Sequence, residues 1–374
     1  MKKKTAHSLS GKRGLFSVIS AVLALMIVFP VVLKAEGNEL EISENIFPDE
    51  VFRNYVQEHF DADGSGTLSE EEIAAVTSID VSGKRMESLE GIAYFTELRE
   101  LNANNTGISD LSFVRPLATH IPMQENLEVL LLDHTMIKDL ELRYLPNLRV
   151  LSLNEAGAER LDLSGNPNLE RLTIDRLYID SLDLSRNEHL RYLSAGRLRT
   201  LKDGFDLSRN PRLEELHLPS CELDHIDLSH NRALRTLDLS GNHLTEVDLS
   251  GQQGLESLTI SANPNLTVLD LSPNPELRTL ICSSLPVKTL DLSNLTKLEK
   301  LDISLCKPET LDLRNLTQLK RLHCAQCELE TLDLSHNTAL EFLDYNDNHI
   351  TNLNLDHLPN LNSIQSGGNN YRID

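Results

Sequence analysis

Oxygen-bearing residues are concentrated in one short stretch near the N-terminal end of the chain, DADGSGTLSEEE, which runs from Asp61 to Glu72. Its carboxylates, hydroxyls and backbone carbonyls are hard oxygen ligands. Calcium binds about six to eight such oxygens in a flexible cage. The stretch therefore predicts a Ca²⁺ site.

The same stretch resembles the calcium-binding loop of the EF-hand family at each diagnostic place. The resemblance implies that Gly66 makes the sharp turn and that Glu72 binds the ion with both carboxylate oxygens. The implied ligands are Asp61, Asp63, Ser65, Thr67 through its carbonyl, Ser69 directly or through water, and Glu72. The alternative is a turn of similar sequence that binds no metal.

Cysteine is the second residue type that could do chemistry. The chain has five cysteines, and the segment Cys324-Ala325-Gln326-Cys327 has the spacing of a redox or metal-binding pair. An odd number of cysteines argues against a framework of disulfides. The choice between chemistry and packing depends on where the cysteines fall in the elements that carry them.

Those elements are repeats, because the sequence from Leu98 onward is self-similar with an anchor leucine about every 21 residues. Residues 118–125 read as an insertion after the first full repeat, and a degenerate copy begins at Val76. The copy at Leu234, LRTLDLSGNHLTEVDLSGQQG, contains an LxL-type pattern in each half. Alternating leucines point to one side of a strand, and stacked copies bury them together. The anchors are Leu98, Leu127, Leu148, Leu169, Leu190, Leu213, Leu234, Leu255, Leu277, Leu298, Leu319, Leu340 and Leu361.

These motifs resemble the bacterial leucine-rich-repeat family, in the nested type whose two halves both imitate the core motif. The resemblance implies a mainly β solenoid with a parallel β-sheet on its concave side. We expect about 14 repeats over residues 76–374. The layout, a helical unit followed by repeats, is internalin-like.

The segment around the acidic loop, residues 47–75, is expected to be a small α-helical, EF-hand-like cap. Apolar residues in 48–60 fall on one helical face, and Ser69 with Glu72 forms a capping box for the second helix. Calcium sensors usually pair two such loops, whereas this chain has one whose exit helix leads into the first repeat. We therefore expect the cap to cover the N-terminal end of the leucine stack, with Ca²⁺ stabilising it. The apolar residues are Val51, Phe52, Tyr55, Val56 and Phe60.

The repeat register assigns the cysteines to the core. Cys221, Cys306 and Cys327 occupy the ninth place of their repeats, where Asn242 and others stand in different copies. Cys282 and Cys324 replace an inward leucine. Buried free thiols pack like small apolar residues, so packing is favoured over redox chemistry or zinc binding, and a disulfide between Cys306 and Cys327 stays conceivable.

A column of carboxylates runs through the second half of ten consecutive repeats. Stacked like charges repel, so they require compensation. One explanation is that each side chain accepts a hydrogen bond from turn N–H groups or hydroxyls; the other is that the column recruits Ca²⁺ or a basic partner. The residues are Glu141, Asp162, Asp183, Asp206, Asp227, Asp248, Asp270, Asp291, Asp312 and Asp333.

Composition indicates export. The first 35 residues hold six Lys or Arg, no acid and an apolar stretch from Leu15 to Leu33, which is the layout of a signal peptide or an uncleaved N-terminal anchor. A linker is expected at 36–46. The remainder holds 29 basic against 57 acidic residues, which excludes nucleic acid as a partner. We expect a secreted or cell-surface protein.

Most outward positions of the concave strands carry small polar residues, and larger side chains there are the candidate ligand-binding residues. No catalytic motif is visible, so we expect a binding protein rather than an enzyme. Its expected partner is a protein of a host or neighbouring cell, or a glycan; the alternative is an envelope-associated spacer. The candidates are Val129, Leu131, Val150, Arg171, Tyr192, His217, Lys300, Arg321, His323 and Phe342.

Overall fold

The computed structural model describes residues 39–109, 125–138, 140–202 and 205–369. The expected signal or anchor (1–35), residues 36–38 of the expected linker and residues 118–124 of the expected insertion lie outside this described part. Within it, no helix combines the length and the apolar character needed to cross a bilayer.

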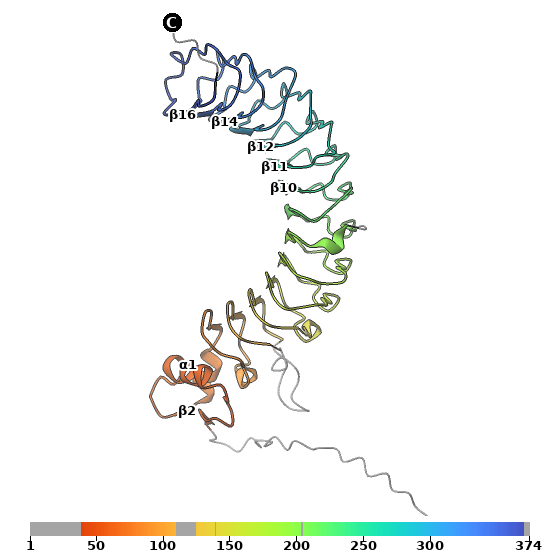
Figure 1. The fold of residues 1–374 in the computed structure, drawn as a ribbon. Coiled ribbons are helices and arrows are strands. Elements are labelled where there is room, and N and C mark those ends of the chain that lie inside the picture. The colour runs from red at the N-terminus through yellow and green to blue at the C-terminus, as the bar shows by residue number, and fades with distance from the viewer. Residues whose placement is uncertain (1–38, 110–124, 139, 203–204, 370–374) are drawn as a thin grey trace, which may run out of the picture. The chain divides into compact units, whose positions relative to one another are not determined.

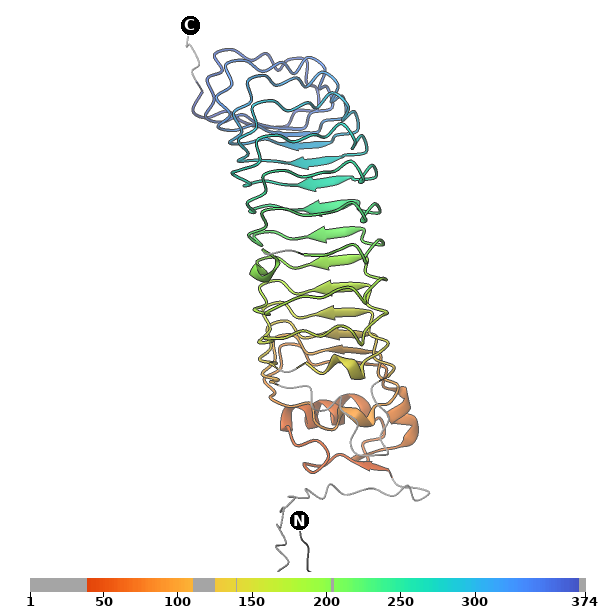
Figure 2. The same cartoon turned by 90° about the vertical axis from the view of Figure 1, so that its right-hand side faces the viewer.

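Fourteen short parallel strands follow one another in chain order to form a single sheet (Figures 1 and 2). Single turns of 3₁₀ helix lie at Ile92–Tyr94, Leu142–Tyr144 and Arg199–Leu201. The strands are β3 (Ser78–Asp80), β4 (Glu100–Asn102), β5 (Val129–Leu131), β6 (Val150–Ser152), β7 (Arg171–Thr173), β8 (Tyr192–Ser194), β9 (Glu215–His217), β10 (Thr236–Asp238), β11 (Ser257–Thr259), β12 (Thr279–Ile281), β13 (Lys300–Asp302), β14 (Arg321–His323), β15 (Phe342–Asp344) and β16 (Ser363–Gln365).

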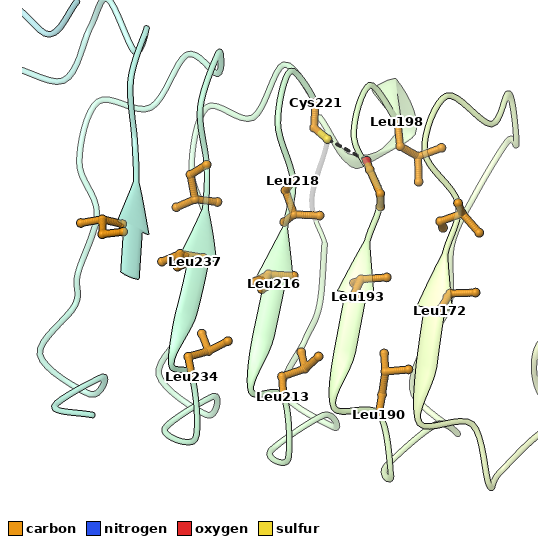
Figure 3. Packing of buried hydrophobic residues seen from close by; sticks show 14 of the residues in the cluster. Leu172, Leu190, Leu193, Leu198, Leu213, Leu216, Leu218, Cys221, Leu234 and Leu237 are labelled. Atoms are coloured by element: carbon orange, nitrogen blue, oxygen red, sulfur yellow. Dashed lines mark hydrogen bonds between the residues drawn. The ribbon is translucent and has the colours of Figure 1, made fainter. Parts of the chain in front are cut away.

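The leucines determine this arrangement. The middle residue of nearly every strand is buried, and it pairs in register with the middle residue of the next strand, as Leu216 does with Leu237. Anchor leucines such as Leu213 and Leu234 form a second buried row beside them (Figure 3). Each repeat buries its leucines only against its neighbours, so the expected mainly β solenoid is confirmed.

The ninth place of the repeat forms a polar column inside the solenoid. The amide of Asn242 donates to the carbonyls of Leu218 and Leu239, both at 2.9 Å, and its oxygen accepts from the backbone N–H of Cys221 at 3.0 Å. Where cysteine takes the place of asparagine, the thiol still donates to the preceding repeat. The Cys221 thiol lies 3.0 Å from the Ala195 carbonyl (Figure 3).

All five cysteines are buried and unpaired. The Cys306 and Cys327 thiols donate to the carbonyls of Cys282 and Ile303, each at 3.1 Å, and no disulfide joins them. Burial raises the pKa of the Cys327 thiol to about 12 and that of Cys324 well above its ordinary value. A thiolate is the reactive form, so this environment favours the packing interpretation over redox chemistry.

Hydrogen bonds from the N–H groups of turns hold the side chains of the acidic column. In nine consecutive repeats an aspartate Oδ1 accepts the backbone N–H two residues later at 2.8–3.1 Å, beginning with Asp162 and Ser164. Hydrogen bonds from Ser164 lower the pKa of Asp162. Arg314 lowers the pKa of Asp312 to about 2. Glu141 differs, because it forms an ion pair with Arg143 at 3.6 Å. The turn explanation therefore accounts for the aspartates.

The N-terminal unit contains β1 (Leu40–Glu41), α1 (Glu50–Phe60), β2 (Thr67–Leu68) and α2 (Glu70–Ala75). Residues 40–41, expected in a linker, instead pair as β1 with β2 in an antiparallel ladder. Val51, expected on the apolar face of the first helix, is 37% exposed. The capping box formed by Ser69 and Glu72 is present.

This unit packs against the first repeat. The Phe47 ring lies 5.8 Å from the Phe52 ring and 6.2 Å from the Phe95 ring, so it joins the helix to the solenoid core. Asp49 caps α1 through the N–H of Phe52 with one oxygen, and accepts the backbone N–H of Glu87 with the other at 2.9 Å. One carboxylate thus orients the helix and attaches it to the repeats.

Gly91 lets Phe47 approach the repeats. Its φ is +97°, and a β-carbon there would overlap the Phe47 ring and lie 2.6 Å from the Ile46 carbonyl. We predict that Gly91→Ala lowers the free energy of unfolding by about 2 kcal/mol or more, because neither backbone nor ring can move away without unpacking the cap. Urea denaturation measures this. Gly254→Ala is the control, since a β-carbon there meets no heavy atom within 4 Å; an equal loss in both variants contradicts the prediction.

Candidate functional site

Three carboxylates converge in the acidic loop. Asp61, Asp63 and Glu72 each offer an oxygen within 4.8 Å of the others, and in the described part of the chain they are the only such group of His, Cys, Asp or Glu. Like charges at this separation repel unless a cation or donors neutralise them. The residues therefore fit a hard divalent cation, and the exposure of the loop gives an ion a route in.

Hydrogen bonds within the loop fix the directions of these carboxylates. Asp61 accepts the N–H groups of Ser65 and Gly66, both at 2.9 Å. Hydrogen bonds from Ser65 lower the pKa of Asp63, and those from Ser69 and the N–H of Ala62 lower the pKa of Glu72. Hydrogen bonds thus make Asp63 and Glu72 more acidic than free carboxylic acids, so both are ionised at neutral pH.

Two other predicted ligands have internal partners. The Ser65 hydroxyl lies 3.2 Å from the Thr67 carbonyl, and the Ser69 hydroxyl donates to Glu72 at 2.9 Å. The loop strand β2 is also fastened from outside, because Leu68 pairs with Leu40 and the Thr67 hydroxyl donates to Glu39. Residues preceding the first helix thus support the back of the loop.

The outward first and third residues of β3–β16, here called the sheet face, carry the predicted ligand-binding residues. The structure brings Arg171, Tyr192 and His217 together on β7–β9. The Arg171 guanidinium carbon lies 3.4 Å from the Tyr192 ring centroid, and the Tyr192 and His217 rings are 5.4 Å apart. This spacing is that of a cation–π stack, which holds the arginine flat against the ring.

A second group occupies β13–β15. Lys300, Arg321 and Phe342 are in register on adjacent strands. The Arg321 guanidinium lies 5.5 Å from the Phe342 ring centroid, and the His323 ring lies 4.6 Å from the same ring. Both groups therefore consist of an arginine, an aromatic residue on the next strand and a histidine.

Val129, Leu131 and Val150 lie on β5 and β6, where Val129 and Val150 are in register and all three are partly exposed. They form a separate apolar row on these two strands.

Sequence reasoning missed a hollow of about 560 Å³ at the edge of the sheet face. Its lining includes the buried Gly196 and the rings of Tyr192 and His217. Asp175 is fixed there by the Ser194 hydroxyl at 2.8 Å and the Gly196 N–H at 2.5 Å. The other lining residues are Asn154, Glu155, Arg176, Arg197, Pro219 and Asp238.

It also missed a charge ladder beside the sheet face. The residue after each anchor leucine alternates in sign over twelve repeats, and ion pairs such as Arg99–Glu128 (3.1 Å) and Arg278–Glu299 (2.8 Å) join neighbours. Hydrogen bonds from Lys320 and Arg278 lower the pKa of Glu299. The ladder could have been found by aligning the repeats on their anchors. It contains Arg99, Glu128, Arg149, Glu170, Arg191, Glu214, Arg235, Glu256, Arg278, Glu299, Lys320 and Glu341.

The fold and these columns define the class of protein, a leucine-rich-repeat solenoid with a helical N-terminal cap. Among solved structures, this chain is similar to the functional domain of InlJ from Listeria monocytogenes, with a TM-score of 0.81 and 28% identity over 91% of this chain and 73% of that one. It is also similar to the Listeria monocytogenes internalin InlF, with a TM-score of 0.75 and 26% identity over 88% and 98%.

A leucine-rich-repeat protein from Leptospira interrogans shares the fold, with a TM-score of 0.64 and 21% identity over 80% of this chain and 86% of that one. No protein-family model and no curated protein matches the sequence. The likeness to the two internalins supports an internalin-like leucine-rich-repeat family and a protein-binding domain. InlJ is described as including a cysteine ladder.

The charge ladder predicts a salt-dependent stability. Arg235→Glu places three carboxylates in succession, because Glu214 and Glu256 flank it and Arg235 pairs with Glu256 at 2.5 Å. We expect a lower melting temperature at low salt and recovery of most of the loss at about 1 M NaCl, where charges are screened beyond about 3 Å. Arg232→Glu makes the same charge change outside the ladder. A salt-independent loss, or an equal loss in the control, contradicts the prediction.

Proposed function

We propose that the chain is an exported binding protein that recognises another protein through the sheet face, with Ca²⁺ stabilising its N-terminal cap. The observation that carries the proposal is the gathering of the large side chains of the sheet face into two groups, around Tyr192 and around Phe342. Aromatic residues and arginine are the types that dominate binding energy in protein interfaces. Small polar residues between the groups leave room for a partner to approach.

The restricted side chains of two arginines on the sheet face support the same function. Arg171 and Arg321 are each held against a ring, so less side-chain freedom is lost when a partner binds. A glycan is the competing partner, since the hollow beside Tyr192 is lined mainly by polar groups. The protein partner is favoured because Arg171 covers one face of the Tyr192 ring, which limits its use as a stacking platform for a sugar.

Location outside the cytoplasm rests on the basic and apolar composition of residues 1–35. Binding at a cell surface or in the medium also agrees with the acidic composition of the rest of the chain, which resists non-specific association with anionic lipid. Secretion and retention by an uncleaved segment both satisfy this part of the proposal.

The role proposed for Ca²⁺ rests on the loop and its connections. Asp61, Asp63 and Glu72 would bind the ion, with oxygens of Ser65, Thr67 and Ser69 completing the set. The loop lies between α1 and α2, and β2 pairs with β1. Neutralising its charge would stabilise the whole cap, which closes the N-terminal end of the leucine stack.

We predict that removing Ca²⁺ with a chelator lowers the melting temperature. At a calcium concentration about 100 times the dissociation constant, the expected stabilisation is about 2.7 kcal/mol. Glu72→Gln should abolish the difference between calcium and chelator while keeping a side chain that can accept from the Ser69 N–H. Glu71→Gln, which removes the adjacent carboxylate, should keep it. Scanning calorimetry measures this, and identical melting of the unaltered protein in both conditions overturns the calcium role.

The binding function is tested by photo-crosslinking. A photoreactive amino acid at Thr259, in the middle of the sheet face, should capture a protein partner from host-cell membranes or medium when calcium is present. The same group at Glu246, an exposed position in the second half of a repeat, is the control. Crosslinks from Thr259 alone support recognition by the sheet face. Equal crosslinking from both positions, or none from Thr259, contradicts it.

A further inference from the structure

Two cations lie side by side on the sheet face without neutralisation. Lys300 and Arg321 are the first residues of β13 and β14 and are paired in register. Neither has a carboxylate within ion-pairing distance among the described residues. Like charges directly opposite each other on neighbouring strands are destabilising. The pairing of two like charges therefore has a cost that no carboxylate offsets within the described part of the chain.

The adjacent charge ladder shows how unusual this pair is. One residue earlier in the same two repeats stand Glu299 and Lys320, which form an ion pair at 2.7 Å. Alternation of sign is kept there over twelve repeats, in a chain with 57 acidic against 35 basic residues. An excess of acids makes acidic partners for a cation abundant, and yet Lys300 and Arg321 form no ion pair with any residue that the structure describes.

The acids on the sheet face of β13–β15 are already engaged. Asp302 and Asp344, the third residues of β13 and β15, accept the backbone N–H groups of Ser304 and Asn346 at 3.0 and 3.1 Å. Asp344 also lies 4.0 Å from His323. The backbone thus orients both carboxylates toward the turns, and the first-residue edge of β13 and β14 presents positive charge.

Phe342 completes the arrangement on the next strand. Its ring centroid lies 5.5 Å from the Arg321 guanidinium and 4.6 Å from the His323 ring centroid. A guanidinium held against a ring keeps its N–H edge available for two parallel hydrogen bonds to a carboxylate. Lys300 adds a point charge beside it.

We propose that Lys300 and Arg321, positioned by Phe342 and His323, bind a carboxylate on an acidic segment of the partner protein. The proposal rests on the proposed function and names the chemistry of one contact. Charge complementarity indicates which group of the partner binds here. Two unneutralised cations attract an anion, and an Asp, Glu or C-terminal carboxylate of the partner supplies one. Binding would remove the repulsion between Lys300 and Arg321.

The group on β7–β9 has the same stack but lacks the second cation. There Tyr192 pairs in register with Arg171 on one side and with Glu215 on the other, and Glu215 lies 3.8 Å from His217. An acid in this place opposes the binding of a carboxylate. The control for loss of one positive charge is Arg232, an exposed arginine that lies outside the sheet face.

The test uses the purified protein and two acetylated, amidated peptides with an uncharged fluorophore, GSEGESG and its glutamine counterpart GSQGQSG. Fluorescence anisotropy at physiological salt gives their affinities. We expect the glutamate peptide to bind more tightly, and Lys300→Gln or Arg321→Gln to weaken its binding by about threefold or more. Arg232→Gln should change it by less than about 1.5-fold. An equal loss in Arg232→Gln, or no preference for the glutamate peptide, overturns the proposal.

A second readout separates recognition from folding. If the pair serves a partner, Lys300→Gln should leave the melting temperature unchanged or raise it, because it removes a like-charge neighbour. A lower melting temperature would show that the pair is structural. Stronger binding of sialyllactose than of the glutamate peptide would overturn the assignment to a protein carboxylate.

Failure here is distinguishable from failure of the proposed function. Crosslinking from Thr259 that persists undiminished in a Lys300→Gln and Arg321→Gln double variant would overturn the carboxylate site and leave recognition by the sheet face intact. Loss of those crosslinks in the double variant, with retention in Arg232→Gln, supports both.

Discussion

Stacking of each repeat on its neighbour is the constraint on which the rest of the structure depends. Backbone bonds between repeats are regular, for example from the N–H groups of Arg149 and Val150 to the Glu128 carbonyl at 2.8 and 2.9 Å. Because strands are spaced by about 4.8 Å, every place in the repeat becomes a column. A residue type is tolerated only if copies of it can lie next to one another.

Each column meets this condition in a different way. Leucines pack on leucines, and amides in the ninth place donate to the repeat before and accept from it. Aspartates in the second half satisfy turn N–H groups, as Asp248 does for Ser250 at 2.9 Å. Charges beside the sheet alternate in sign. The two ends cannot follow the rule, and at the N-terminal end α1 and Phe47 replace the missing neighbour.

This constraint also explains what could be predicted from the sequence. A column of identical residues repeats at a fixed interval, so the leucine core, the assignment of Cys221 to the ninth place and the turn role offered for the aspartates were all readable. The carboxylates of the acidic loop were readable for a different reason, since twelve adjacent residues contain the whole pattern. A contact that occurs only once in the chain has no repeating or local sequence pattern by which it could be predicted. Pairing of β1 with β2 involves only two residues on each strand, and the hollow is lined by residues of several different repeats.

The left-handed turn of each repeat could not be predicted from the sequence, because glycine, the residue that usually marks such a turn, is rare there. One turn residue in most repeats has a positive φ, but it is glycine only at a few of them, such as Gly241, while Arg176 and Gln326 adopt the same conformation elsewhere. Non-glycine residues are disfavoured there, so the backbone bonds between repeats, such as that from the Arg176 N–H to the Gly196 carbonyl at 2.8 Å, must hold the turn in place. Tertiary stacking overrides local preference.

The columns leave the sheet face as the part of the repeat that is free to vary. Its outward side chains do not fill the leucine core, and the hydrogen bonds between neighbouring repeats are made by backbone atoms. Substitutions on this face can therefore change what it binds without disturbing the stack. A departure from the column rule is therefore more informative on this face than elsewhere. Lys300 beside Arg321 is such a departure, because the neighbouring ladder places opposite charges at the same two repeats. The repulsion between these two cations is the cost that the proposed carboxylate of a partner at β13 and β14 would offset.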